Sequence, residues 1–476
     1  MKYIFLIVLG SIQLVSAAVS VMEFGAKGDG KADDTRAIQA ALETGRNVVI
    51  PEGIFRITNS LEPKANQVIE LVGTVRISDS NIQPLTADAA AGQPSFTVAD
   101  ASGYYVGQWV GLGAEDLKIQ GGGKIKVRRE GGDCAKIVKI EGNTISFERP
   151  LRRDYLVKAN ARVGTQPSAF LITTPGVRIH GTGVIDGNRK NQFDFAPADM
   201  TPGKWSRGEE TRAGCGITVD SYLEPIDHIR IEGITIQDCI LHNISLYRAR
   251  HSMISRVTCL RAHDKNILLR YCEYSQLIGN QCLDSEFEDG IIFYTGNHHC
   301  VAQGNICARN ARLGVAVNAF QTGILLSGNV CKDNPANLTL RGDFCSSTGD
   351  FCGGKGGVVI EGRGNQVNGL VSLCPINISS TDLNYTGGIV SGTEEAPLQA
   401  GMQVARTTDD RRTALVDGVR IRGVTFKHCA TAASVFGVVK DVRFLGNRLL
   451  TKEAFKIAKE CQGEVKLEGN EVVERE

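Results

Sequence analysis

Between Asn243 and Asn337 the chain repeats one short motif at a nearly constant spacing of roughly two dozen positions, and this period constrains its fold more than any other feature. Each repeat begins with a turn residue, Asn or Gly, and continues with apolar positions that alternate with polar ones. A fixed period in this range is typical of solenoids and arrays rather than of one compact domain. The repeats begin at Asn243, Asn266, Gly290, Gly314 and Asn337.

Short strands, not helices, fit the residues inside each repeat. Runs of period-two alternation bounded by Gly and Asn are typical of strands, and each repeat is too short for a helical hairpin. Because short strands that stack on copies of themselves bury a continuous core, we expect an all-β fold, a parallel β-helix. One column of apolar side chains should face inward from coil to coil: Ile244, Ile267, Ile291, Val315 and Leu338.

A second ladder extends the solenoid toward the C-terminus. Gly and Asn tolerate the left-handed backbone that a sharp turn between coil strands requires. Pairs of these residues recur at Gly279-Asn280, Gly304-Asn305 and Gly328-Asn329, and again at Gly446-Asn447 and Gly469-Asn470. We therefore expect coils almost to the last residue of this sequence.

Cysteines form a third ladder. Cys259, Cys282, Cys307 and Cys331 occur once per coil, and an apolar residue, Ile236, holds the same place one coil earlier. This pattern predicts a stack of buried thiols. The better candidates for a disulfide are Cys345 and Cys352, which lie in a Gly-rich segment. The sequence has no Cys-x-x-Cys pair, so we expect no metal site.

Residues 1–17 indicate a secretory signal peptide. Lys2 supplies a positive charge, a largely apolar run follows, and Val15-Ser16-Ala17 offers small residues for cleavage. We therefore expect a secreted protein, extracellular or periplasmic. No other apolar run is long enough to cross a membrane. A net charge of +1, from 53 basic and 52 acidic residues, gives no reason to expect nucleic-acid binding.

The most specific linear motif is FGAKGDGKADDTRAIQAAL at Phe24–Leu42. It predicts a Gly-rich turn followed by a helix that begins near Thr35, with Asp33 or Asp34 as its cap. The apolar residues that follow lie on one face of that helix. Such a helix would cover the open end of a solenoid, which needs a cap.

This motif resembles the N-terminal signature of the pectate-lyase-like superfamily of right-handed β-helix proteins, which includes phage tailspikes and relatives of glycoside hydrolase family 28. The segment GVIDGN at Gly183–Asn188 is similar to one of the early coils of that superfamily. The resemblance implies a right-handed parallel β-helix that acts on polysaccharide.

Breaks in the repeat divide the chain. Short strands separated by Gly-rich turns predict a small inserted β-subdomain at 86–165, and a Gly-, Ser- and Thr-rich composition predicts a long loop insertion at 342–410, with room for one more coil at Gly357–Leu370. The expected segments are a signal peptide (1–17), the cap helix and first coils (18–85), the subdomain (86–165), the central coils with the site (166–341), the loop (342–410) and C-terminal coils (411–476).

Aligning the coils on their turn residues brings many titratable side chains to one edge of the central solenoid. Four carboxylates within two coils are the candidate catalytic groups: Asp264, Glu286, Glu288 and Asp289. Around them lie side chains suited to bind sugar through aromatic stacking, hydrogen bonds or guanidinium–carboxylate pairs. These candidate substrate-binding residues are Asp220, His242, Tyr247, His263, Lys265, Arg270, Tyr294 and Arg312.

Paired carboxylates favour glycoside hydrolysis. Stacked groups lie about 4.8 Å apart in adjacent coils, and hydrolysis uses a carboxylic acid and a carboxylate roughly 5 to 9.5 Å apart. Crowding also helps one carboxyl group stay protonated. We therefore expect a polysaccharide-degrading hydrolase, related to family 28, that requires no cofactor.

Two other functions fit the same residues. A lyase or C5-epimerase that acts on uronate glycans would use Lys265, Arg270, His242 or a tyrosine as base, with an arginine or calcium neutralising the uronate carboxylate. A glycan-binding solenoid without catalysis is the third, and the charges would then form a salt-bridge ladder. The expected partner is a polysaccharide, neutral or acidic, and the sequence leaves the oligomeric state open.

Overall fold

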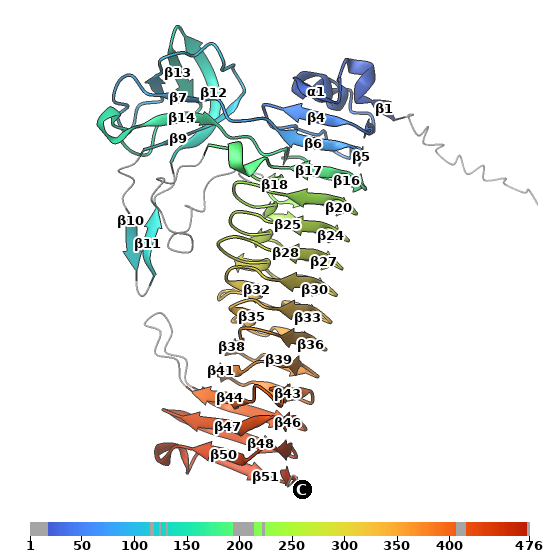
Figure 1. The fold of residues 1–476 in the computed structure, drawn as a ribbon, viewed down its shortest axis with the longest axis vertical. Helices are drawn as coiled ribbons and strands as arrows, with labels where there is room; N and C mark the ends of the chain where they lie inside the picture. The colour runs from blue at the N-terminus through green and yellow to red at the C-terminus, as the bar shows by residue number, and fades with distance from the viewer. Residues whose placement is uncertain are drawn as a thin grey trace, which may run out of the picture.

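The computed structural model describes residues 18–114, 119–122, 125–129, 132–193, 214–220, 224–405 and 416–473, with backbone alone for 119–122 and 125–129. These residues form a long solenoid of parallel strands with three faces (Figure 1). Connections between parallel strands are right-handed, so the fold is the expected right-handed parallel β-helix. The predicted signal peptide, residues 1–17, lies outside the described residues.

The first face follows the Asn and Gly turns of the sequence repeat. Its strands are β15 (Phe170–Ile172), β18 (Ile217–Asp220), β22 (Ile244–Tyr247), β26 (Ile267–Arg270), β29 (Ile291–Thr295), β32 (Leu313–Val317), β35 (Ala336–Leu340), β38 (Val358–Arg363), β41 (Ile376–Thr381), β44 (Leu398–Ala405), β47 (Cys429–Phe436) and β50 (Glu453–Ile457).

The second face comes next along each coil. Its strands are β1 (Val19–Ser20), β3 (Val48–Ile50), β5 (Val68–Leu71), β16 (Arg178–Gly181), β20 (Arg230–Glu232), β24 (Met253–Ser255), β27 (Gln276–Ile278), β30 (Val301–Gln303), β33 (Leu325–Ser327), β36 (Ser346–Thr348), β39 (Gln366–Asn368), β42 (Asn384–Thr386), β45 (Val416–Arg422), β48 (Val439–Leu445) and β51 (Val465–Glu468). The first two faces are joined where Thr381 pairs with Asp417. Short β19 (Ile226–Asp227) and β23 (Ala249–Arg250) pair in the turn between them.

The third face closes the coil. Its strands are β2 (Asp29–Asp33), β4 (Ile54–Ile57), β6 (Thr74–Ile77), β17 (Val184–Asp186), β21 (Thr235–Gln237), β25 (Thr258–Leu260), β28 (Gln281–Leu283), β31 (Ile306–Ala308), β34 (Val330–Lys332), β37 (Phe351–Gly353), β40 (Val371–Ser372), β43 (Ile389–Ser391), β46 (Thr425–Lys427), β49 (Arg448–Leu450) and β52 (Glu471–Val472).

The strands stack in the predicted register. Ile244 pairs with Ile267, Ile267 with Ile291, Ile291 with Val315 and Val315 with Leu338. All five side chains are buried in one continuous core. The period of the sequence therefore measures one turn of the solenoid, and the inward column is confirmed.

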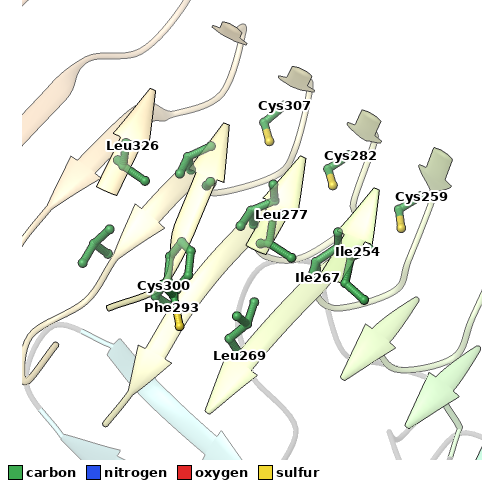
Figure 2. Packing of buried hydrophobic residues seen from close by; sticks show 14 of the residues in the cluster. Ile254, Cys259, Ile267, Leu269, Leu277, Cys282, Phe293, Cys300, Cys307 and Leu326 are labelled. Carbon is green, nitrogen blue, oxygen red and sulfur yellow. The ribbon is translucent and has the colours of Figure 1, made fainter. Parts of the chain in front are cut away.

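A column of thiols runs through this core. Cys259, Cys282, Cys307 and Cys331 pair in sequence across the third face and are fully buried, as predicted; Figure 2 shows the first three in a row. The predicted disulfide between Cys345 and Cys352 is wrong, because all 14 cysteines are free. Cys352 pairs with Cys331 and continues the thiol column, whereas Cys345 precedes β36 on a different side of the coil.

Buried amides hold the coils in register at the turn from the second to the third face. Asn280, Asn305 and Asn329 each donate from Nδ2 to the next side chain in the ladder at 2.9 Å, and Asp350 accepts the last of these bonds. We call these four residues the amide ladder. Each is wholly buried, so the Gly-Asn pairs of the sequence mark turns that hydrogen bonds lock together.

The predicted loop insertion at 342–410 is wrong for residues 342–405, and its residues 406–410 lie outside the described residues. Residues 346–405 form β36 to β44, which continue all three faces without interruption. The coil length varies here: the steps from Leu338 to Val358 and from Val358 to Ile376 are shorter than the step from Val315 to Leu338, and the step from Ile376 to Met402 is longer. The changed coil length hides the repeat in the sequence.

An inserted β-subdomain occupies the region for which the sequence predicts one. Its six-stranded antiparallel sheet consists of β7 (Ile82–Pro84), β8 (Ser95–Thr97), β9 (Trp109–Gly113), β12 (Cys134–Glu141), β13 (Thr144–Phe147) and β14 (Arg162–Thr165), with a hairpin of β10 (Ile119–Gly122) and β11 (Ile125–Arg129). It has its own apolar core and lies beside the first coils (Figure 1). Lys136 Nζ joins it to Glu62 of the solenoid at 2.6 Å.

The N-terminal end of the solenoid is covered by α1 (Thr35–Glu43), which packs Ile38, Ala41 and Leu42 on the core. Asp33 Oδ1 accepts from the Thr35 N–H at 3.0 Å, whereas Asp34 accepts from Lys27 and Gly28. Among the described residues, no helix has the length and apolar character needed to cross a membrane. The remaining helices are single 3₁₀ turns: η1 (Val21–Phe24), η2 (Val157–Ala159), η3 (Arg189–Asn191) and η4 (Lys459–Cys461).

Candidate functional site

The predicted site residues gather where the third face turns into the first, which we call the site edge. Its stacked turns are residues 238–243, 261–266, 284–290 and 309–312. Neutral hydrogen bonds close these turns: Asn266 Nδ2 donates to the Leu283 carbonyl oxygen at 3.2 Å and to Asn310 Oδ1 at 3.0 Å. Neutral hydrogen bonds therefore link these turns in addition to the charged side chains.

Lys265 is the centre of the site edge. Its ammonium lies 3.1 and 3.2 Å from the two carboxylate oxygens of Asp264 and 2.7 Å from Glu288 Oε2. His242 Nδ1 lies 3.6 Å from Asp264 Oδ2. Because Lys265 is only 3% exposed, its charge is held inside the protein by two carboxylates from adjacent coils.

Arg312 extends this network by one coil. Its guanidinium donates to both oxygens of Asp289, at 2.9 and 2.7 Å, and lies 3.0 Å from Glu288 Oε2. Asp289 is wholly buried, whereas the Arg312 side chain is 39% exposed. Glu288 therefore lies between two cations, and Asp289 is enclosed behind one.

Glu286 belongs to a second group. His263 Nδ1 lies 2.8 Å from Glu286 Oε2, which also accepts a short hydrogen bond from Arg189. The Phe287 ring packs edge-on against His263 at a centroid distance of 4.3 Å. Glu286 has the most exposed side chain of the four candidate carboxylates, at 38%, and two neighbours fix its position.

Burial and charge together set ionisation in the network. Burial alone would lower the pKa of Lys265, but Asp264, Glu288 and Asp289 outweigh it and raise that pKa above its ordinary value. Burial opposes the charge of Arg312 as well, yet Asp289 and Glu288 raise its pKa. Burial raises the pKa of Asp289, although Arg312 counteracts this. The carboxylates thus stabilise the charged form of Lys265, which weighs against a role as base.

The first face presents a column of outward side chains beside the site edge. Asp220 pairs with Tyr247 and Tyr247 with Arg270. The register then shifts, because Arg270 pairs with Thr295 and Tyr294 is the extra residue. Bulges of this kind re-aim a side chain. Tyr294 lies against two cations, its ring centroid 4.8 Å from the Arg270 guanidinium carbon and 5.9 Å from Lys265 Nζ.

The structure therefore brings most of the predicted residues together. Ten of them lie in the two charged groups or beside Tyr294: His242, His263, Asp264, Lys265, Arg270, Glu286, Glu288, Asp289, Tyr294 and Arg312. Tyr247 is turned to the opposite end of its strand, where its ring packs on Arg248 and Tyr271. Asp220 is buried next to it in register.

Sequence reasoning missed Arg189. This residue lies in η3, outside the repeating turns, and reaches Glu286 across 97 residues of sequence. The repeat aligns residues within coils and carries no information on side chains that enter from an irregular segment. The one sequence feature that could have pointed to Arg189 is the predicted coil at Gly183–Asn188, which ends directly before it.

Known proteins resemble parts of this chain. Residues 18–113 match the family model described as rhamnogalacturonase A/epimerase, pectate lyase-like. The pre-neck appendage protein of Bacillus phage phi29 is 39% identical over 61 residues, which are 13% of this chain and 7% of that protein. Alginate lyase 7 of Azotobacter vinelandii is 30% identical over 136 residues, 21% of this chain and 16% of that protein. The chain thus covers only a small part of the length of either relative.

Two solved structures share the fold along almost the whole chain. The A-module of a mannuronan C-5 epimerase of Azotobacter vinelandii aligns with 96% of this chain and 100% of its own, with a TM-score of 0.54 and 13% identity. Gene product 12 of bacteriophage phi29 aligns with 96% of this chain and 56% of its own, with a TM-score of 0.53 and 14% identity. The shared fold and the match at 18–113 confirm the resemblance of this chain to the pectate-lyase-like superfamily of right-handed parallel β-helix proteins.

Proposed function

We propose that the protein is a polysaccharide-modifying enzyme that removes the proton next to a uronate carboxylate, as a lyase or a C5-epimerase. The position of Lys265 carries the proposal, because its ammonium lies between Asp264 and Glu288. The two bridged oxygens are at most about 6 Å apart, a separation that would suit a retaining hydrolase. The ammonium, however, fills the space where the anomeric carbon would have to lie.

The other carboxylates weigh against hydrolysis as well. A hydrolase needs a neutral carboxylic acid that can reach the glycosidic oxygen. Glu286 is bound by Arg189 and His263, and Asp289 is wholly buried behind Arg312. Removal of a proton next to a carboxylate needs a base and a cation instead, and both are present on the first face.

Tyr294 and Arg270 are the residues to which we assign these roles. Both are half-buried on the outer side of the first face, and the bulge at Tyr294 aims this ring at the site edge. Arg270 would pair with the uronate carboxylate and stabilise the charge that develops beside it. Tyr294 would take the proton from C5. In elimination, the C4–O bond breaks, a C4=C5 double bond forms, and Tyr294 passes the proton to the departing oxygen. In epimerisation, water returns a proton to C5 from the opposite face, and Tyr294 releases its proton to solvent.

The names of two relatives support this class of substrate. One matched protein is an alginate lyase and one structural neighbour is a mannuronan C-5 epimerase. Both names denote chemistry on uronate polymers.

We further propose that the protein is exported after loss of residues 1–17. N-terminal sequencing of the exported product should begin at Ala18, and retention of Met1 would contradict this.

Purified protein should be incubated with a panel of neutral and acidic polysaccharides. Ultraviolet absorbance of the product detects elimination, proton exchange at C5 in deuterated water detects epimerisation, and new reducing ends without absorbance detect hydrolysis. We expect absorbance or exchange on an acidic polymer. Reducing ends alone would contradict the proposal and favour the hydrolase, and binding without any of the three signals would favour a glycan-binding solenoid.

Two matched tyrosine variants test the assignment. Tyr294→Phe removes only the hydroxyl group and should lower turnover by about 100-fold or more. Tyr274→Phe changes an exposed ring that stacks on His251 and His299, at the turn between the first and second faces, and should leave turnover unchanged. Equal activity of both variants would remove Tyr294 from the mechanism.

A further inference from the structure

We infer that Lys265 is the resident cation of the site edge: its ammonium does between Asp264 and Glu288 what a bound divalent ion would do, and the site does not depend on calcium. The inference rests on the proposed function only in naming the source of positive charge in that site. The residues involved belong to adjacent coils, so one side chain ties two turns of the solenoid together.

The residues of the site edge do not fit a calcium ion. Calcium takes six to eight oxygen ligands, several of them from carboxylates. Both oxygens of Asp264 and Oε2 of Glu288 are bound to Lys265 at 2.7–3.2 Å, and both oxygens of Asp289 are bound to Arg312. Within the described part of the chain, no three His, Cys, Asp or Glu side chains are grouped so as to hold a metal ion.

The Lys265 ammonium is buried between its two carboxylates, as a bound metal ion at this position would be. It is only 3% exposed, and Asp264 and Glu288 are at most 9% exposed. Three carboxylates, counting Asp289, face two cations, Lys265 and Arg312. Loss of Lys265 would leave two buried carboxylates facing each other with no cation between them. Their repulsion is strong in such a poorly solvated place.

Truncation of Lys265 should therefore create a cation site. The removed ammonium leaves its volume and two carboxylates with unbalanced charge, and a small cation that enters this volume restores the balance. Lys265 is only 3% exposed, so it acts on the substrate only through the groups that it holds. It is a positioning residue.

The test measures thermal unfolding of Lys265→Ala in calcium chloride, in methylammonium chloride and in tetramethylammonium chloride at matched ionic strength. The first two cations should raise its Tm saturably by at least about 1 °C, whereas tetramethylammonium, which is too large to enter, should not. No such rise in Tm is expected for wild-type protein, for the exposed-lysine control Lys332→Ala, or for the double variant Lys265→Ala with Glu288→Gln. An equal response of Lys265→Ala and Lys332→Ala would overturn the inference.

A second comparison applies if Lys265→Ala does not fold. Lys265→Met should then also fold poorly, and the additional change Glu288→Gln should restore soluble, folded protein, because it removes one of the two buried carboxylates whose charge Lys265 balanced. A double variant no better than the single one would overturn the inference. Both comparisons measure stability, so their outcome is separate from that of the substrate screen. In an active enzyme, EDTA should change wild-type turnover by less than twofold, and a loss that calcium restores would also overturn it.

Discussion

The amide ladder and the site edge are both columns of buried polar side chains that recur once per coil, yet they differ in charge. The amide ladder links Asn280, Asn305 and Asn329 by neutral hydrogen bonds of 2.9 Å. The site edge instead encloses Lys265 and Asp289. A buried ion pair is weak evidence for stability, since apolar residues often replace one without loss.

The difference separates a structural role of polar side chains from the role that we propose for the charged ones. Neutral amides close the turns of the site edge as well, so the solenoid has a way to hold its coils together without buried charge. For the ionic groups concentrated in a few coils we therefore propose another role, the positioning of Tyr294 and Arg270. The comparison predicts that changes in the amide ladder alter stability and that changes at the site edge alter turnover.

The largest effect is expected in the amide ladder. Asn305→Ala removes the oxygen that accepts from the Asn280 backbone and side chain, and the Nδ2 that donates to Leu277 O and Asn329. Several buried groups lose their partners, so the free energy of unfolding should fall by about 3 kcal/mol or more. Denaturant unfolding measures this, with Asn384→Ala, an exposed asparagine on β42, as control. Turnover per folded molecule should not change; a tenfold loss would contradict the separation of the two regions.

A smaller effect is expected from Glu286→Gln, and it should fall on turnover instead of on stability. The ion pairs of Glu286 are partly exposed and add little stability, but they hold Arg189 and His263 at the site. Turnover should fall about tenfold, while the denaturant midpoint stays close to that of wild type. Asp284→Asn is the matched control. Asp284 lies in the same turn as Glu286, is similarly exposed, and is paired with Arg309 of the next coil. If both variants lost turnover equally, the effect would belong to the turn and not to Glu286.

The smallest effect concerns the acidic end of the amide ladder. Burial raises the pKa of Asp350 above its ordinary value of 3.8. A raised folded-state pKa means that its contribution to stability is present below the unfolded pKa and is lost as the pH rises through the folded pKa. Asp350→Asn keeps the acceptor for Asn329 without the charge, so it should raise the free energy of unfolding at pH 7 by about 1 kcal/mol.

Denaturant unfolding between pH 4 and pH 8 tests this expectation. The advantage of Asp350→Asn should shrink as the pH falls toward 3.8, where the wild-type carboxyl group becomes neutral in both states. A variant that is less stable than wild type at pH 7, or whose advantage grows in acid, would show that the carboxylate stabilises the ladder.

The sequence predicts the fold as far as the coil length stays constant. Ile244, Ile267 and Ile291 recur at nearly equal steps along the chain, and strand pairing follows these steps. Beyond Leu340 the coils first shorten and then lengthen, while the three faces continue. The change in coil length falls in the turns between strands, so the strands still stack where the sequence repeat is lost. Composition alone then resembles that of a loop.

The candidate site is predictable in its location and not in its contacts. Register places Asp264 and Glu288 in neighbouring coils, but only the path of the Lys265 side chain determines that its ammonium lies between them. The bulge that aims Tyr294 depends on the pairing of Arg270 with Thr295. Arg189 enters from an irregular segment. Such details depend on side-chain packing that a one-dimensional repeat does not encode.

The buried free cysteines of this protein can serve as natural probes of local unfolding. Every cysteine of the protein is buried and reduced; Cys134 lies in the inserted β-subdomain, and the others are distributed along the solenoid from Cys215 to Cys461. A thiol reagent can reach a given sulfur only after the surrounding coil opens. The rate at which each cysteine is alkylated, followed by mass spectrometry, would therefore map local unfolding along the axis without any engineered label.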